Sequence, residues 1–277
     1  MDKPAGPSSH QALSGLKRRF GTGRVGHAGT LDPPATGLLV CAVGKATRLL
    51  QEIEAREKEY LFGLCLGTET TTLDMDGEVL RQVEVPDPAG IDWEALLPRF
   101  VGELMQVPPA VSALKVDGVR SYDLARRGEA VEHPARPVTV HSLEFCQELS
   151  IAAGNPVLRV RCSKGTYVRS LARDLGEALG FPISVSTLRR TAIGPWRLPD
   201  EHVAVEEPLL VGVEAFLSDW PRFEAGEEGR AALRTGKSVP CELPDGDQVL
   251  ALDGQALAFG RVRDGRFLPS GLLIDAQ

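Results

Sequence analysis

The chain has 277 residues, 43% of them hydrophobic and 25% charged, so it can bury the cores of one large and one small globular domain. Its five cysteines form no C-x-x-C pair and its five histidines show no ligand spacing, which excludes a disulfide framework and predicts no metal site. The sequence shows no apolar run long enough to span a bilayer and no signal peptide before Ser8, so we expect a cytoplasmic protein.

The net charge of −7 argues by itself against a nucleic-acid partner, but the charges are unevenly distributed. Residues 1–50 carry seven Lys and Arg against two Asp, and residues 156–197 carry eight Lys and Arg against two acids. The acidic residues gather instead in 52–103 and 200–228. This asymmetry predicts a basic face that an RNA backbone would sense, although solvated surface charge can produce the same pattern.

The first expected element is a helix that Ser8 or Ser9 can cap and that ends at Gly21. Residues 25–37 follow as a shaped loop, because three glycines permit unusual backbone angles and two prolines fix φ. Asp32 is the only acidic group in this loop. A lone carboxylate on a loop beside a strand is a candidate reactive or binding group, although Asp-Pro is also a common turn starter.

The rest of the chain alternates between strand-like and helical patterns. The expected strands are 38–43, 60–66, 138–145, 157–162 and 186–194, and the expected helices are 45–53, 93–100, 122–127 and 166–180. A looser acidic stretch between residues 200 and 228 contains two prolines. The strand-like pieces after it are 248–252, 255–263 and 266–273. They suggest a small β barrel after a domain boundary near residue 223.

Residues 26–39, together with Gly44-Lys45-Ala46-Thr47-Arg48, resemble the catalytic signature of the bacterial tRNA pseudouridine-55 synthases, the TruB family. The Lys-Pro-x-Gly-x-Ser-Ser pattern at 3–9 and the Ser-Ala-Leu-Lys…Arg-Pro pattern at 112–137 are similar to the same family. One family motif, Thr-Asp-Thr-x-Asp-x-x-Gly, is altered. Thr70-Thr71-Thr72 stands where its first Asp is expected, while Asp74 and Asp76 remain.

The resemblance implies an α+β protein with a pseudouridine synthase fold, in which helices flank a mixed, largely antiparallel sheet over residues 1–222. It also implies an RNA-clamping insertion around residues 108–135, for which a plain helical hairpin is the alternative. The resemblance further implies that residues 223–277 form a small C-terminal β-barrel, a PUA-like RNA-binding domain.

The resemblance identifies Asp32 as the catalytic carboxylate of a reaction that breaks the N1–C1′ bond of a uridine and rejoins the base through C5. A carboxylate must be ionised to act as nucleophile or base, and a dry pocket would raise its pKa, so it needs a nearby cation. The resemblance gives that role to Arg169, which would otherwise be a surface helix residue. Tyr60 is expected to stack on the base, unless it is a core residue of its strand, and Tyr167 to hydrogen-bond or transfer a proton near Asp32.

Six further residues are expected to hold the RNA. The resemblance implies that His27 enters the RNA loop and fills the space left by the flipped base. Leu188 would form an apolar wall of the pocket, although a leucine on a strand is usually a core residue. The residues expected to hold phosphates, and so to set register rather than sequence, are Lys3, Arg48, Arg189 and Arg190.

We therefore expect an isomerase that flips the T-loop uridine of tRNA into a pocket and converts it to pseudouridine. No cofactor is expected, because the reaction needs no redox change or external energy. The expected partner is the T-arm stem-loop of tRNA, with no membrane and no metal, and the protein is expected to be a monomer. The alternative is a non-catalytic protein that binds and refolds tRNA without needing Asp32. A hydrolase would lack a second carboxylate or a metal site in the Asp32 loop.

Overall fold

The computed structural model of the chain describes all residues except 86, 113–114, 117–118, 122–132, 200–207 and 274–277. The helix expected at 122–127 and much of the insertion expected around 108–135 lie outside the described residues. The chain divides into two compact units, each assembled from segments that are separated in sequence. The first unit consists of Met1–Ala12, Gly29–Val40 and Glu52–Glu206, and the second of Leu13–Ala28, Cys41–Gln51 and Glu207–Gln277.

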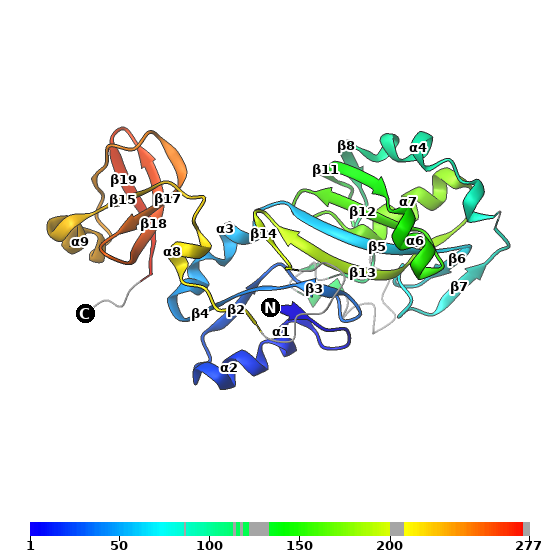
Figure 1. The fold of residues 1–277 in the computed structure, drawn as a ribbon, viewed down its shortest axis with the longest axis horizontal. Helices are drawn as coiled ribbons and strands as arrows, with labels where there is room; N and C mark the ends of the chain where they lie inside the picture. The colour runs from blue at the N-terminus through cyan, green and yellow to red at the C-terminus, as the bar shows by residue number, and fades with distance from the viewer. Residues whose placement is uncertain (86, 113–114, 117–118, 122–132, 200–207, 274–277) are drawn as a thin grey trace. The chain divides into compact units, whose positions relative to one another are not determined.

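An eight-stranded sheet is the framework of the first unit (Figure 1). Its strands are, in spatial order, β1 (Asp2–Lys3), β3 (Thr36–Leu38), β13 (Ile183–Ile193), β5 (Lys58–Leu66), β12 (Val157–Cys162), β11 (Arg136–Phe145) and β8 (Gly102–Gln106), with β14 (Trp196–Arg197) also pairing with β13. The β13–β3 pair is parallel and the other pairs are antiparallel. The expected mixed, largely antiparallel sheet is therefore confirmed.

Helices cover the central strands of this sheet. α7 (Val168–Leu179), α4 (Trp93–Leu96) and the 3-10 helix η3 (Leu97–Phe100) share one apolar cluster with β5 and β12. The periodic apolar residues of α7 bury one face of the helix, and Gly180 ends it at φ 84°, as the sequence predicted. The cluster contains Phe62, Leu64, Leu158, Val160, Leu171 and Leu175, all fully buried.

The parallel pairing of β3 with β13 depends on a glycine. Gly37 lies opposite Arg190 with φ at +106°, and a Cβ added to it would lie 2.3 Å from the backbone oxygen of Arg190. An L-residue would meet both a strained backbone and a backbone clash there. Gly37 therefore lets the strand that follows Asp32 lie directly against β13.

Shorter elements complete the first unit. They are α1 (Ser9–Ala12), β6 (Thr68–Thr70), β7 (Val79–Gln82), η2 (Pro88–Gly90), β9 (Lys115–Val116), β10 (Val119–Arg120) and α6 (Gln147–Ala153). β6 and β7 form a hairpin, and in the connection between them Asp74 makes an isolated bridge to Val185 of β13. This bridge brings the 70–77 turn to the sheet beside Leu188.

The second unit contains a five-stranded sheet near the C-terminus, in the order β15 (Arg222–Glu224), β17 (Gly246–Leu252), β18 (Ala256–Arg263), β19 (Arg266–Leu272) and β16 (Val239–Pro240). Its other elements are α2 (Ser14–Phe20), β2 (Val25–Ala28), η1 (Gly44–Leu49), α8 (Val213–Phe216) and α9 (Gly226–Arg234), while β4 (Val40–Val43) and α3 (Leu50–Glu54) run across the division. The curled sheet agrees with the expected PUA-like barrel. The residues expected to form a loop at 25–37 include β2, so that expectation was partly wrong.

A single boundary at residue 223, as expected, would not separate the two units. Residues 13–28 and 41–51 also belong to the second unit. Within that unit, Arg48 donates from Nη1 to the backbone oxygen of Leu272 at 2.6 Å, which ties η1 to β19. None of the described helices is both long enough and apolar enough to cross a membrane.

Candidate active site

Asp32 lies in a tight turn of the first unit that neighbouring groups hold in place. Its backbone oxygen accepts a hydrogen bond from the Ala35 amide at 3.1 Å. Ser9 holds the preceding residue, because its hydroxyl donates to the Leu31 oxygen at 2.9 Å and accepts from the Leu31 amide at 2.8 Å. Leu31 and Ala35 are buried, whereas 36% of the Asp32 side chain is exposed. The backbone of Asp32 thus makes the turn, and its carboxylate is left available for chemistry.

Two buried cations support this turn from behind. Lys3 is fully buried, and its ammonium donates to the backbone oxygens of Pro4, Pro33 and Ala35 at 2.7–3.0 Å. Arg190, 1% exposed, donates to the backbone oxygens of Gly29 and Leu38. The donors of both residues face backbone carbonyls inside the protein, so a phosphate would have to compete with these bonds, and their expected contacts with phosphates stay a prediction.

Burial has a measurable consequence for Lys3. Loss of solvent lowers the pKa of its ammonium to about 8, against the opposing effect of the Asp32 carboxylate, and Arg190 lowers it further. Lys58, which donates to the backbone oxygens of Glu54 and Arg56, also has its pKa lowered to about 8, by burial first and by Arg190 second. The Asp32 turn therefore lies within a field of buried positive charge.

Arg169, the second residue of α7, meets Asp32 directly. Its Nη2 lies 2.9 Å from Asp32 Oδ2, so the ion pair predicted between residues 137 positions apart is present. Nη1 also donates to the Thr72 oxygen at 2.7 Å, and Nη2 to the Val111 oxygen at 3.1 Å. The guanidinium is only 5% exposed, and these acceptors surround it and fix its plane.

A second carboxylate, that of Asp74, completes the surroundings of Arg169. Asp74 Oδ2 lies 3.6 Å from Arg169 Nε, and the Asp74 side chain is 11% exposed. Its Oδ1 accepts hydrogen bonds from the Thr72 hydroxyl and, at 3.2 Å, from the Asp76 amide. The three side chains form a network in the order Asp32, Arg169, Asp74, in which both carboxylates face one guanidinium.

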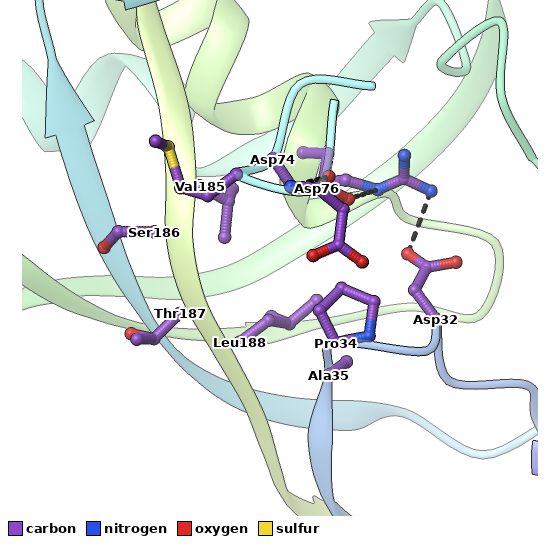
Figure 2. Close-up of a pocket in the computed structure, with 11 residues that line it drawn as sticks. Asp32, Pro34, Ala35, Asp74, Asp76, Val185, Ser186, Thr187 and Leu188 are labelled. Carbon is purple, nitrogen blue, oxygen red and sulfur yellow. Dashed lines mark hydrogen bonds and ion pairs between the residues drawn. The ribbon is translucent and has the colours of Figure 1, made fainter. Parts of the chain in front are cut away.

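A cavity of about 70 Å³ lies beside this network (Figure 2). Its walls come from the Asp32 turn, from the 74–76 turn and from residues 185–188 of β13. Figure 2 shows the Asp76 carboxylate and the Leu188 side chain facing the same space, near Pro34. The lining residues are Asp32, Pro34, Ala35, Asp74, Met75, Asp76, Arg169, Val185, Ser186, Thr187 and Leu188. Apolar groups and carboxylates thus share one small cavity.

Tyr60 and Tyr167, which were expected to act on the base, are not among the residues that line this cavity. Tyr60 is half-buried on β5, and burial raises the pKa of its phenol although a hydrogen bond with Arg190 opposes the rise. Burial also raises the pKa of the Tyr167 phenol, against the effect of Arg136 and of a hydrogen bond with Ser112. Both phenols are sensitive to the Asp32 charge. Their roles on the substrate stay predictions.

The other predicted RNA-binding residues lie in different settings. Leu188 lies on the cavity wall, where an apolar contact was expected. Arg189 is held by Asp2 through two hydrogen bonds of 3.0 and 2.7 Å, so a phosphate would have to compete with that carboxylate. His27, half-buried on β2, and the exposed Arg48 belong to the second unit. Their contacts with RNA stay predictions.

Part of the network was not predicted from the sequence. Asp74 was noted as a remnant of a family motif without a role, and Thr72 was not identified as its hydrogen-bond partner. The spacing Asp74-x-Asp76 was an available signal, because an Asp side chain commonly accepts a hydrogen bond from the backbone amide two residues on, as Asp74 does here. Among the described residues, no group of three or more His, Cys, Asp or Glu could hold a metal ion.

Comparison with known proteins decides the family. Residues 17–168 match the model of the TruB family pseudouridylate synthase N-terminal domain. The chain is 42% identical over 283 residues to tRNA pseudouridine synthase B of Paracoccus denitrificans (strain Pd 1222), covering 98% of this chain and 93% of the relative. The chain belongs to the TruB family.

Two further relatives extend the comparison. tRNA pseudouridine synthase B of Thermobifida fusca (strain YX) is 42% identical over 287 residues and covers 97% of this chain, with 95% of its own length matched. Among solved structures, a chain in the crystal structure of a Cbf5-Nop10-Gar1 complex matches with a TM-score of 0.64 at 26% identity, covering 94% of this chain and 76% of that one. This TruB family member is thus an isomerase, a tRNA pseudouridine synthase.

Proposed function

We propose that the chain isomerises the T-loop uridine of tRNA and that Asp32 is the carboxylate that acts on it. In this reaction the N1–C1′ bond breaks, the C5–C1′ bond forms, C5 loses its proton and N1 gains one. The atoms and electrons balance within the substrate and solvent, so no cofactor is required. The observation that carries the proposal is the Asp32–Arg169 ion pair of 2.9 Å at the wall of the cavity.

The pair orients the Asp32 carboxylate and leaves it accessible. A guanidinium at hydrogen-bond distance favours the charged form of a carboxylate and fixes its orientation. The side chain of Arg169 is 5% exposed and that of Asp32 is 36% exposed, so the cation stays inside the protein while the carboxylate borders the cavity. An ionised carboxylate in this position can act as nucleophile or base on a nucleotide held against Leu188.

The substrate must leave its stack to reach this site, because a uridine inside a folded RNA does not expose its sugar carbon and base edge to a recessed carboxylate. We assign the apolar wall to Leu188, base stacking to Tyr60 and hydrogen bonding near Asp32 to Tyr167. His27 would occupy the vacated position in the RNA loop, and Arg48 and Arg189 would contact phosphates. Because we propose a tRNA substrate, we expect the enzyme to act in the cytoplasm, and we expect it to act as a monomer.

Asp32→Asn tests the proposal because it keeps the shape of the side chain and removes its charge. Tritium at C5 of uridine is released to water when the C5–C1′ bond forms, so single-turnover release from tRNA labelled at C5 measures the reaction. We expect a loss of at least about 10³-fold in this rate with tRNA retention on filters unchanged, since a group acting in acid–base catalysis contributes roughly 10²–10⁴-fold.

Asp247→Asn is the matched control. Asp247 also pairs with an arginine, Arg263, but its side chain is 76% exposed and it lies in the second unit. Its variant should retain the wild-type rate. Tritium release by Asp32→Asn at the wild-type rate would show that the carboxylate is not the catalytic group. Binding without any release by the wild-type protein would favour a tRNA-refolding role instead.

The T-loop assignment needs a separate substrate comparison. A T-arm stem-loop labelled only at its loop uridine should release tritium at a rate similar to full-length tRNA. The same stem-loop with label only in its stem uridines should release none. Release from stem uridines would refute the T-loop assignment while leaving the isomerase activity intact.

A further inference from the structure

Gln106, at the end of β8, makes an unusual pair of contacts with the start of α7. Its side-chain Oε1 accepts a hydrogen bond from the Tyr167 amide at 2.8 Å, and its Nε2 donates to the Tyr167 carbonyl oxygen at 3.1 Å. Gln106 is 2% exposed, so water competes little for these bonds. The side-chain amide thus binds the backbone of Tyr167 as a neighbouring strand would, using one acceptor and one donor in one plane.

Tyr167 is the residue that precedes the first turn of α7. It has extended backbone angles (φ −104°, ψ 113°), and it makes no side-chain cap of the helix. Its carbonyl oxygen already accepts the first helical hydrogen bond, from the Leu171 amide at 3.1 Å. Gln106 therefore fixes both the amide and the carbonyl of Tyr167, the residue from which the helix starts. Fixing this residue also restrains the first turn of α7.

The residues that come after Gln106 in the chain also make hydrogen bonds to the start of α7. The Val107 oxygen accepts hydrogen bonds from the Ser170 hydroxyl at 2.8 Å and from Arg173 Nη2 at 3.2 Å. The Val111 oxygen accepts from Arg169, and the Ser112 side chain shares a hydrogen bond with the Tyr167 phenol. Gln106 differs from these neighbours because its side chain, and not its backbone, makes the hydrogen bonds to the backbone of Tyr167. A substitution of Gln106 therefore removes these two bonds and leaves the other contacts possible.

We propose that Gln106 is a positioning residue for the isomerisation: by fixing the backbone of Tyr167, it places Arg169 where its guanidinium meets Asp32. The proposal rests on the proposed roles of Asp32 and Arg169. Arg169 comes two residues after Tyr167, and its Nη2 reaches Asp32 Oδ2 at 2.9 Å, so a displacement of about 1 Å at the helix start could take the contact out of hydrogen-bond range. A displacement of that size at a reacting group costs up to roughly 10²-fold in rate.

Gln106→Met is the first test, because methionine has nearly the shape of glutamine and can make neither hydrogen bond. We expect single-turnover tritium release at saturating enzyme to fall by about 10- to 100-fold. The dissociation constant for tRNA should change little, and the thermal unfolding midpoint should fall because two buried hydrogen bonds are lost, with the variant still folded at the assay temperature. The matched control is Glu103→Gln, an exposed residue on the same strand, which should retain the wild-type rate.

Gln106→Glu gives a pH-dependent readout that a merely structural role would not produce. An ionised glutamate keeps the acceptor for the Tyr167 amide but opposes the Tyr167 carbonyl with a second acceptor. A protonated glutamate again offers one donor and one acceptor. The rate of this variant relative to wild type should therefore rise as the pH falls from 8 towards 5, whereas the deficit of Gln106→Met should stay constant over that range.

The outcomes separate this proposal from the role of Asp32. A Gln106→Met rate within about twofold of wild type, or a defect that saturating enzyme removes, overturns the positioning role even if Asp32→Asn is inactive. An active Asp32→Asn overturns the proposed catalytic role instead, whatever Gln106 does. If Gln106→Met fails to fold, Gln106→Glu decides: a relative rate that does not recover at low pH overturns the proposal.

Discussion

Two carboxylate–guanidinium clusters of the first unit use the same chemistry in different surroundings. Glu59 on β5 is 7% exposed, and its Oε1 accepts hydrogen bonds from Arg159 at 3.2 Å, Arg197 at 2.8 Å and Thr191 at 2.9 Å. The Asp32 side chain is 36% exposed, meets the single guanidinium of Arg169 and lines the cavity. The first carboxylate is enclosed by donors from neighbouring strands, and the second faces space that a substrate could enter.

The comparison shows that an ion pair alone does not mark a reactive site. Burial disfavours the charged form of Glu59, yet the hydrogen bonds from Arg197 and Thr191 outweigh it and lower the pKa of this carboxyl. The ionised Glu59 therefore stabilises the packing of β5 against β12 and β13. In the Asp32 cluster the guanidinium is enclosed and the carboxylate is accessible. Accessibility of one partner, rather than the pairing itself, distinguishes the proposed catalytic cluster from the structural one.

Arg169→Lys should have the largest effect among the variants that separate the two clusters. A lysine carries the charge but cannot reach Asp32, Asp74 and two backbone oxygens from one planar group. We expect single-turnover tritium release to fall by more than about 10²-fold, as for a misplaced reacting group. The matched variant Arg159→Lys at the Glu59 cluster should keep the rate within about twofold of wild type, and equal losses in the two variants would refute the distinction.

Asp74→Asn sharpens the comparison within the proposed catalytic cluster. Asparagine keeps the acceptor for the Thr72 hydroxyl and the Asp76 amide but removes the charge 3.6 Å from Arg169 Nε. Arg169 would then have a single carboxylate partner, and its orientation would be less fixed. We expect the single-turnover rate to fall by roughly 10-fold, less than for Arg169→Lys, because contacts at this distance are weaker than a direct hydrogen bond. A larger loss than that of Asp32→Asn would place Asp74, not Asp32, at the reacting atoms.

Glu59→Gln should affect stability instead of activity. Removing one charge from a buried hydrogen-bonded cluster should lower the free energy of unfolding by about 1–3 kcal/mol, measured by urea denaturation, with tritium release within about twofold of wild type. Because the folded pKa of Glu59 lies below its ordinary value of 4.5, its contribution is present above that pH and is lost as the pH falls through the folded pKa. The difference in unfolding free energy between wild type and variant should therefore shrink in acid. A rate of tritium release clearly more than twofold below wild type would contradict a purely structural role.

Lys3→Met tests the support behind the Asp32 turn through its pH dependence. The pKa of Lys3 is about 8 in the folded protein against 10.5 for an ordinary lysine, so the unfolded chain binds more protons between these values. The contribution of Lys3 to the free energy of unfolding should therefore rise between about pH 8 and pH 10.5 and stay constant below pH 8. The measured quantity is the unfolding free energy of wild type minus that of the variant, so other titrating groups cancel.

The exposed Lys164 supplies the control for this measurement. The same subtraction with Lys164→Met should show no rise over the alkaline range. An equal slope for both lysines would mean that Lys3 is not buried as the structure describes.

Local sequence patterns determined the individual elements well. Apolar periodicity placed β5, β12, β13 and α7 within a few residues of their observed bounds, and Gly180 marked the end of α7 because it adopts a positive φ. The glycine- and proline-rich segment made Asp32 a candidate reactive group, and only the resemblance favoured that role over a simple turn residue. The resemblance named Arg169 as its partner, and the structure joins the two.

Tertiary structure alone decided which charges became supports and which face the cavity. Lys3 and Arg190 look like phosphate-binding residues because they lie in basic segments of the sequence, yet both donate to backbone carbonyls around the Asp32 turn. Asp74 joins Arg169 across 95 residues of chain, and Gln106 reaches Tyr167 across 61. Periodicity reports only which face of one element is apolar. The partners of a polar side chain depend on which distant segments pack together. That packing determined which of these residues stabilise the Asp32 turn and which border the cavity.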